Sequence, residues 1–418
     1  MLSVPDAVAR ILAGVEPLEA ESVALGDTLG RVLAEEVISP ITLPHRTNSA
    51  MDGYAVRGED VRGASESSPV ELPVLETIAA GAFPTKSLTP QTATRIMTGA
   101  PLPEGADTVV RVEDTDAGLT RVRILKDRDA GKNIRLRGED LVEGGVALPQ
   151  GIAVGAAQIG VLASVGKASA LVHRQPWVAI LGSGDELVDL DQFDEVRAGR
   201  RIVSSNSYTL DALVRGAGGV PMGFGHCADT LEAMRALLEK AVAAKPDLLV
   251  TSAGVSVGEF DHTRTALEAM GAVMDFWKVK MRPGAPLGFG RVAGIPWIGL
   301  PGNPVSAMVT FELFARPVVR RMLGHTRLHR RTVSVTLEEA VTIGARLTHF
   351  YRAIVTPRVD GSLTARLTGP QGSGILTSMS LANALIIVPE DRPRVEAGER
   401  LSALLLTEDA GSAEGFAL

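Results

Sequence analysis

Three loops of this 418-residue chain combine the residue types that proteins use to hold phosphate groups. They span residues 182–187, 252–261 and 300–303, and each follows an apolar run typical of a buried strand. Glycines let the backbone approach a ligand closely, and successive backbone N–H groups bind anions. We therefore expect the ligand-contacting residues to be Gly182, Ser183, Gly184, Ser252, Gly254, Ser256, Gly258, Pro301, Gly302 and Asn303.

Carboxylates in the same loops offer the hard oxygen ligands that Mg²⁺ prefers. We expect Glu186 and Asp261 to bind Mg²⁺ beside the phosphates, with Asp185 and Glu259 as substitutes. Each loop also has a structural interpretation, because glycine turns and aspartate helix caps are common features. The convergence of all three loops on one edge of a sheet favours the binding site.

From residue 176 onward the sequence alternates between strand and helix patterns, which predicts a doubly wound α/β domain with a mostly parallel sheet. Ligands of such sheets bind outside the carboxyl ends of the strands. The predicted strands cover residues 177–181, 247–251, 276–281, 287–292 and 297–300. The predicted helices cover residues 206–215, 229–244 and 261–270, and a further helix begins at Asn303 and should kink or end at Pro317.

The remaining segments predict three further parts of the chain. Residues 1–47 carry helical patterns at 5–13 and 27–36, and residues 142–172 return to that region with a helix over 155–165. Residues 48–141 form a β-rich insert with strands at 53–57, 70–78, 94–97, 108–112 and 120–125. The α/β domain spans residues 173–326, and residues 327–418 form a C-terminal β-barrel or sandwich.

The composition narrows the function classes. A net charge of −7 argues against a nucleic-acid partner, which would require a basic face. No run of residues is long and apolar enough to predict a membrane span. Cys227 is the only cysteine, which excludes an internal disulfide, a cysteine-based zinc site and an iron–sulfur cluster. We expect a soluble cytoplasmic protein.

Six separated strings carry a resemblance to one protein family. They lie at 49–55 (Ser-Ala-Met-Asp-Gly-Tyr-Ala), 96–101 (Ile-Met-Thr-Gly-Ala-Pro), 133–140 (Asn-Ile-Arg with Gly-Glu-Asp), 184–187 (Gly-Asp-Glu-Leu), 256–261 (Ser-Val-Gly-Glu with Asp261) and 299–307 (Gly-Leu-Pro-Gly-Asn-Pro-Val-Ser-Ala). With these strings in the family's order, the chain resembles the MoeA family. That family includes the C-terminal domain of gephyrin and the plant molybdenum-insertase domain.

The resemblance implies a molybdopterin molybdenumtransferase, which is a homodimer that uses Mg²⁺. Its substrates would be molybdate and adenylylated molybdopterin, with AMP released. It implies an elongated N-terminal helical region, a β-rich inserted domain, a three-layer α/β domain like that of the pterin adenylyltransferases, and a C-terminal β-barrel-like domain. Further candidate partners are the molybdopterin adenylyltransferase and the enzymes that accept the finished cofactor.

Position by position, the resemblance implies catalytic roles for Asp52, Thr98, Asp140, Glu186 and Lys278, metal binding by Glu186 and Asp261, and substrate binding by Arg352 and Ser373. Where relatives usually have Lys-Pro-Gly-Lys-Pro, this chain has Arg282-Pro-Gly-Ala-Pro286. Arg282 can still bind an oxyanion, whereas Ala285 removes a charge. Because Lys278 and Arg282 lie four apart on a strand-like segment, we expect them to face the same side as a cationic lining.

Two alternatives stay open. The first is the molybdopterin adenylyltransferase reaction, although an enzyme of that kind normally consists of the α/β domain alone. The second is a non-catalytic scaffold that binds the pterin and keeps the fold. The carboxylates and Lys278 argue against a scaffold, and the changes at Arg282 and Ala285 argue slightly for it.

Overall fold

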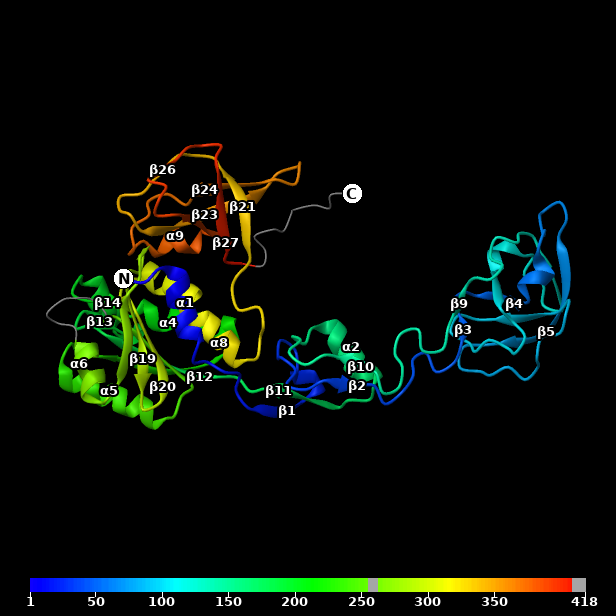
Figure 1. Ribbon diagram of the computed structural model, residues 1–418, viewed down its shortest axis with the longest axis horizontal. Helices are drawn as coiled ribbons and strands as arrows, with labels where there is room; N and C mark the ends of the chain where they lie inside the picture. The colour runs from blue at the N-terminus through cyan, green and yellow to red at the C-terminus, as the bar shows by residue number, and fades with distance from the viewer. Residues whose placement is uncertain (255–261, 408–418) are drawn as a thin grey trace. The chain divides into compact units, whose positions relative to one another are not determined.

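The computed structural model describes residues 1–254 and 262–407. The chain divides into two compact units, drawn in Figure 1. The larger unit comprises Met1–Ala34, Gly151–Gly155 and Ser169–Leu418, and the smaller comprises Glu35–Gln150 and Ala156–Ala168. The finer division into four domains stays a prediction. Within the described ranges, no helix has the length and apolar character needed to cross a membrane.

A six-stranded sheet forms the centre of the larger unit, with the strand order β15-β12-β16-β20-β19-β17. The strands are β15 (Val220–Cys227), β12 (Trp177–Ser183), β16 (Leu248–Ser252), β20 (Ile295–Leu300), β19 (Pro286–Val292) and β17 (Val273–Lys278). The first four are parallel, and β19 runs antiparallel to both β20 and β17. This arrangement confirms the mostly parallel α/β sheet predicted from the sequence.

Helices cover both faces of this sheet because its strands are apolar on both sides. Val178 and Ile180 of β12 pack in one core cluster with residues of α1, α4, α7 and α8, whereas Ala179 and Leu181 pack with residues of α5 and α6. Figure 1 shows α5 and α6 on one side of the sheet and α4 with α8 on the other. The helices are α1 (Val4–Leu12), α4 (Ser205–Ala217), α5 (Leu231–Ala243), α6 (His262–Ala269), α7 (Pro304–Thr310) and α8 (Arg316–Met322).

The predicted helix over residues 27–36 is wrong. Only a 3₁₀ turn at Leu25–Asp27 forms there, and Gly30 has a φ of 77°, which interrupts a helix. The backbone N–H groups of Gly30 and Leu33 donate instead to the carbonyls of Val154 and Ile152. The apolar spacing of this segment therefore reflects pairing with a returning chain. Nearby, β1 (Ala20–Ala24) pairs with β11 (Ser169–His173).

Pro317 does not end the helix that begins at Asn303. Between α7 and α8 the chain forms a π-helical turn at Phe311–Ala315, and Pro317 lies in the first turn of α8. Ala315 and Arg316 before it have helical φ/ψ of −77°/−42° and −57°/−45°, so the hydrogen bond that a proline cannot donate is missing inside a continuous helical path. The π turn thus lets the helical path continue past the proline.

Residues after 331 form a closed β-barrel in the larger unit. Strand β23 (Thr348–Pro357) pairs with both β24 (Leu363–Leu367) and β25 (Ala384–Val388), and β21 (Thr332–Leu337) and β27 (Arg400–Leu405) complete the ring. The short strand β18 (Met281–Arg282) adds to β23 in parallel, which places Arg282 opposite His349. Smaller elements are β22 (Val341–Thr342), β26 (Arg394–Val395) and α9 (Leu376–Ser380).

The smaller unit contains a five-stranded sheet in the order β7-β4-β6-β5-β8. Its strands are β4 (Gly53–Val56), β5 (Val70–Ile78), β6 (Ala93–Ile96), β7 (Thr108–Arg111) and β8 (Arg121–Ile124), each within one residue of the predicted boundaries. Further elements of this unit are β2 (Val37–Ile38), β3 (Asn48–Ser49), β9 (Ile134–Arg135), β10 (Val146–Leu148) and α2 (Ala156–Ser164).

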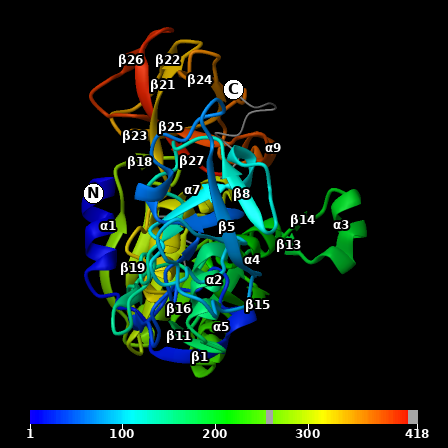
Figure 2. The same cartoon turned by 90° about the vertical axis from the view of Figure 1, so that its right-hand side faces the viewer.

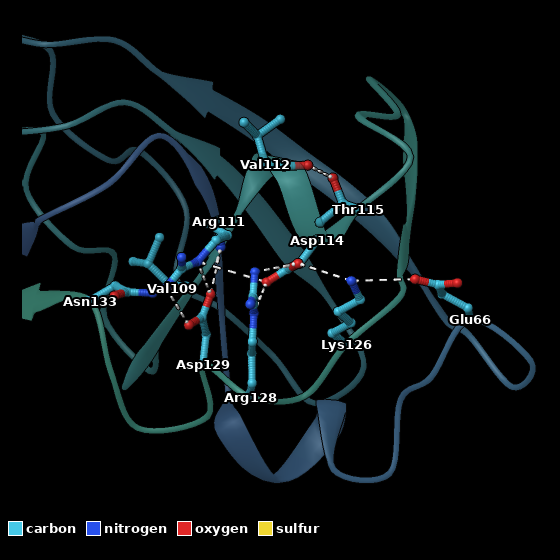
Figure 3. A network of polar contacts seen from close by, with 10 residues as sticks. All are labelled: Glu66, Val109, Arg111, Val112, Asp114, Thr115, Lys126, Arg128, Asp129 and Asn133. Carbon is cyan, nitrogen blue, oxygen red and sulfur yellow. Dashed lines mark hydrogen bonds and ion pairs between the residues drawn. The ribbon is translucent and has the colours of Figure 1, made fainter.

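A buried carboxylate network holds the end of β7 in the smaller unit (Figure 3). Asp129 is 1% exposed, and it accepts hydrogen bonds from Nε and Nη2 of Arg111 at 2.9 and 3.0 Å. Asp114 is 2% exposed and accepts from Arg128 at 2.6 and 2.8 Å. Burial alone would raise the pKa of Asp129, but the hydrogen bonds from Arg111 and Asn133 outweigh it and hold that pKa below its ordinary value.

We expect Asp129→Asn to lower the melting temperature of the smaller unit by about 5 °C, because a charge-assisted pair is lost. A lowered native pKa stabilises the fold above the ordinary aspartate pKa of about 3.9, and this contribution disappears as the pH falls through the native pKa. Thermal melts between neutral and acid pH test both points. Glu113→Gln, which changes an exposed carboxylate beside the network, is the matched control. Equal melts for the two variants would contradict a stabilising role for Asp129.

Candidate functional site

The described parts of the three predicted loops line one pocket of about 440 Å³, which we call the sheet-edge pocket. It lies at the carboxyl ends of β12, β16 and β20, where doubly wound sheets bind their ligands. The loop residues in its wall are Gly182, Ser183, Glu186, Leu187, Ser252, Ala253, Gly254, Pro301, Gly302 and Asn303. The structure therefore brings together loops that are up to 121 positions apart in the sequence (residues 182 and 303).

The first turn of α4 also lines the sheet-edge pocket, and the sequence analysis missed it. Ser204, Ser205, Asn206 and Ser207 contribute to the wall. The amide nitrogen of Asn206 donates to the Ser252 hydroxyl and to the Gly302 carbonyl, both at 2.7 Å, so it ties two of the loops together. The sequence predicted only a helix over residues 206–215 here, although the four consecutive polar residues 204–207 after a strand are a signal for a binding loop.

Glu186 is the one carboxylate residue among those that the structure describes in the wall of the sheet-edge pocket. Gly184 has a φ of 152°, and a Cβ at this position would lie 2.8 Å from a Glu186 carboxylate oxygen. This φ favours a glycine, and a side chain here would displace the Glu186 carboxylate. Among the described residues, Glu186 forms no hydrogen bond or ion pair through its side chain, so its oxygens suit a hard cation.

Of the other predicted metal ligands, only Asp185 belongs to the described residues, and it does not line the sheet-edge pocket. Asp185 accepts a hydrogen bond from the Asp229 backbone N–H at 3.1 Å, and it lines a separate hollow with Gly184 and Cys227. Figure 2 shows β13 (Leu187–Val188), β14 (Ile202–Val203) and α3 (Phe193–Arg197) standing out from the sheet, and residues of β13 and α3 border that hollow. Ser256, Gly258, Glu259 and Asp261 fall outside the described residues. In the described ranges, no three His, Cys, Asp or Glu side chains cluster as metal ligands.

Cys227, the sole cysteine, is not poised as a nucleophile or metal ligand. Burial, with a contribution from the nearby carboxylate of Asp229, raises the pKa of its thiol to about 11. The thiol therefore stays protonated at neutral pH, whereas metals and electrophiles react with thiolates.

A second pocket of about 410 Å³, which we call the barrel pocket, lies between the α/β sheet and the β-barrel. Residues 281–286 with Pro301, Asn303 and Ser306 form one wall. The barrel provides the other wall, with Leu347, His349, Phe350, Tyr351, Arg352, Gln371, Gly372 and Ser373. The predicted site residues Arg282, Arg352 and Ser373 thus meet in one pocket.

Arg352 has a structural role in the wall of the barrel pocket, because most of its hydrogen-bond donors are used by other groups of the protein. Its side chain is fully buried, and its guanidinium donates to the carbonyls of Pro370, Gln371 and Gly372 at 2.9 to 3.2 Å and to the Ser378 hydroxyl at 2.9 Å. No carboxylate among the described residues pairs with it. Burial lowers the pKa of Arg352, yet an arginine keeps its charge in proteins. It therefore adds an unneutralised positive charge to the pocket.

Arg282 supplies the accessible cation of the barrel pocket. Its side chain is exposed and has no hydrogen bond or ion pair with a described residue. His349 adds no charge at neutral pH, since burial lowers its pKa, and Arg282 lowers it further against the opposing effect of the Leu347 carbonyl. Burial likewise raises the pKa of Tyr351, which stays protonated. The pocket thus favours an anion that Arg282 can reach.

Lys278 and Arg282 do not share a wall, which corrects the expected cationic lining. The strand predicted over 276–281 breaks after Lys278, where the Val279 N–H donates to the Ala285 carbonyl, and β18 then joins the barrel. Lys278 instead lines a different hollow with Arg10, Arg264 and Trp277. The alternation rule fails here because it holds only within one continuous strand.

The smaller unit carries the remaining predicted residues. One Asp52 carboxylate oxygen accepts from both the backbone N–H and the hydroxyl of Thr98, at 2.7 and 2.8 Å. These two hydrogen bonds lower the pKa of Asp52, so the exposed carboxylate stays ionised and keeps its second oxygen free. Asp140 is also exposed, and its backbone N–H donates to the Leu43 carbonyl.

Comparisons with known proteins cover nearly the whole chain. Residues 2–166 match the family model "MoeA N-terminal region (domain I and II)", residues 179–321 match "Probable molybdopterin binding domain", and residues 334–406 match "MoeA C-terminal region (domain IV)". A Mycobacterium tuberculosis protein named molybdopterin molybdenumtransferase 2 is 39% identical, with 96% of this chain and 98% of the relative covered. The Bacillus subtilis molybdopterin molybdenumtransferase is 36% identical, with 98% and 95% covered.

A solved structure supports the same likeness. The molybdopterin biosynthesis moeA protein from Pyrococcus horikoshii OT3 superposes with a TM-score of 0.82 at 27% identity. The superposition covers 97% of this chain and 100% of the other. The likeness therefore extends over both units and the barrel.

Proposed function

This chain belongs to the MoeA family, and on that premise we propose that it is a molybdenum insertase. It transfers molybdate to adenylylated molybdopterin and releases AMP. The observation that carries this proposal is the pair of pockets that share Pro286, Pro301 and Asn303 in their walls. Insertion needs a pterin phosphate and an oxyanion held side by side, and the two pockets offer neighbouring places of suitable chemistry.

The sheet-edge pocket would hold the pterin and its phosphate through the backbone N–H groups and hydroxyls of its loops. The barrel pocket would hold molybdate beside Arg282, whose planar guanidinium can meet an oxyanion with two hydrogen bonds. Cleavage of a phosphate–AMP bond depends on positioned charge more than on a protein nucleophile. The protein would therefore act by holding the pterin phosphate and molybdate in one fixed relative position.

Glu186, together with Asp261, would bind Mg²⁺. The unpaired carboxylate of Glu186 in the sheet-edge pocket fits this role. When bound, the ion would supply positive charge to the phosphate oxygens.

Asp52 would act as a fixed negative charge and hydrogen-bond acceptor, held ionised by Thr98, and Asp140 would assist it. Three further predictions stay untested: a homodimer, a cytoplasmic location and the protein partners. The mass in solution tests the homodimer and the partners, and cell fractionation tests the location.

We expect Glu186→Gln to need about tenfold more Mg²⁺ for half-maximal AMP release, because one anionic ligand is lost. Asp185→Asn is the matched control, since an asparagine oxygen can still accept from the Asp229 N–H. AMP release measured against Mg²⁺ concentration separates the two variants. A Mg²⁺ dependence of Glu186→Gln equal to that of the wild type would remove Glu186 from the metal site.

A further inference from the structure

Among the residues that the structure describes, Asn303 is the one polar side chain common to the walls of the two pockets. The pockets share three lining residues, and the other two, Pro286 and Pro301, have no hydrogen-bonding side chain. Asn303 is exposed, and its amide forms no hydrogen bond with a described residue. A free amide with two N–H donors and one carbonyl acceptor therefore stands at the boundary between the two pockets.

The usual structural role of an asparagine at this position is taken by another group. Asn303 is the N-cap of α7, where an asparagine side chain commonly accepts a hydrogen bond from the first turn. Here the Asn303 side chain makes no such bond, and the Val305 N–H donates to the Ser373 carbonyl of the barrel loop at 3.1 Å. The barrel thus caps the helix, which releases the Asn303 amide for a ligand.

The barrel loop that performs this capping is itself firmly held. The Arg352 guanidinium donates to the carbonyls of Pro370, Gln371 and Gly372. The Gln371 side chain accepts from the Arg352 backbone N–H at 2.9 Å and donates to the Arg352 carbonyl at 3.1 Å. Ser373 is therefore fixed next to α7, so the release of the Asn303 amide is a built feature of this wall.

We infer that Asn303 binds both substrates at once, donating one N–H to the pterin phosphate and the other to molybdate, and so couples their binding. The inference rests on the proposed function, because it takes its two ligands from it. Two anions in neighbouring pockets repel each other, and a shared donor offsets that repulsion. The first ligand also fixes the amide rotamer, so the second ligand binds without paying that ordering cost.

The test measures molybdate affinity by calorimetry with and without saturating molybdopterin, which carries the phosphate but no AMP. For the wild type we expect molybdopterin to tighten molybdate binding about fivefold, and by linkage molybdate to tighten molybdopterin binding equally. In Asn303→Ala the tightening should vanish or reverse, since the anions then only repel each other. Asn303→Ala should melt like the wild type, because the Ser373 carbonyl still caps α7.

Ser205→Ala is the matched control, because Ser205 lines only the sheet-edge pocket. This variant should weaken molybdopterin binding and keep the fivefold coupling. A fivefold tightening that persists in Asn303→Ala would overturn the inference, as would a wild type that binds both ligands independently. A wild type that binds neither ligand would instead overturn the proposed function itself.

Discussion

Arg282→Ala is expected to raise the molybdate concentration for half-maximal AMP release by about 10- to 100-fold, the effect of losing charge-assisted hydrogen bonds. Arg282 is the accessible cation of the barrel pocket, since the Arg352 donors are mostly engaged and His349 is neutral at pH 7. The molybdopterin dependence should change much less, because Arg282 does not line the sheet-edge pocket. Initial rates at varied molybdate concentrations measure the effect.

Two companion variants make this prediction specific. Arg282→Lys keeps the charge but loses the planar fork, so it should fall between the wild type and Arg282→Ala. Ala285 lines the same pocket, and Ala285→Lys adds a cation there, so we expect it to lower the molybdate requirement. An Arg282→Ala enzyme with unchanged molybdate dependence would show that the barrel pocket is not the oxyanion site.

Asp52→Asn is expected to lower kcat by about 100-fold while the fold is retained, an effect of the size found for charged groups that act in catalysis. Asparagine keeps the size of the side chain, and its carbonyl oxygen can still accept both hydrogen bonds from Thr98. The substitution therefore removes the charge and spares the local structure. Steady-state AMP release at saturating substrate concentrations measures kcat, and circular dichroism checks the fold.

The variant Thr98→Val tests whether the activity at acid pH follows the ionisation of Asp52. The hydrogen bonds from Thr98 lower the pKa of Asp52, so the ionised form persists well into the acid range. Activity that requires this form is lost as the pH falls through the pKa of Asp52. Removal of the Thr98 hydroxyl raises that pKa, so the acid limb of the rate profile should move to higher pH. An unmoved acid limb would mean that Asp52 is not the group that titrates.

Local sequence patterns correctly predicted the parts of the fold that follow from a single structural rule. Strand β5 covers the residues predicted for it, Val70–Ile78. The strand-end loops met in the sheet-edge pocket because parallel strands bring their carboxyl ends to one edge. Helical spacing misled over residues 27–36, where Gly30 and pairing with residues 152–154 override it.

Long-range contacts account for what the sequence analysis missed. Nothing local to Lys278 and Arg282 indicates that the chain leaves the sheet between them to join the barrel. The resemblance pointed to Arg352, but only the fold shows that its donors hold the barrel loop. The release of the Asn303 amide depends on a carbonyl 70 residues further along the chain, at Ser373, which no local pattern can predict.

The most direct measurement of the central claim is AMP release from adenylylated molybdopterin in the presence of Mg²⁺, with and without molybdate. The proposed insertase releases AMP when molybdate is present, and the pterin product then carries molybdenum. A scaffold would release no AMP in either case, and an adenylyltransferase would instead consume ATP when supplied with free molybdopterin. AMP release that does not respond to molybdate, with no molybdenum on the pterin, would contradict the account.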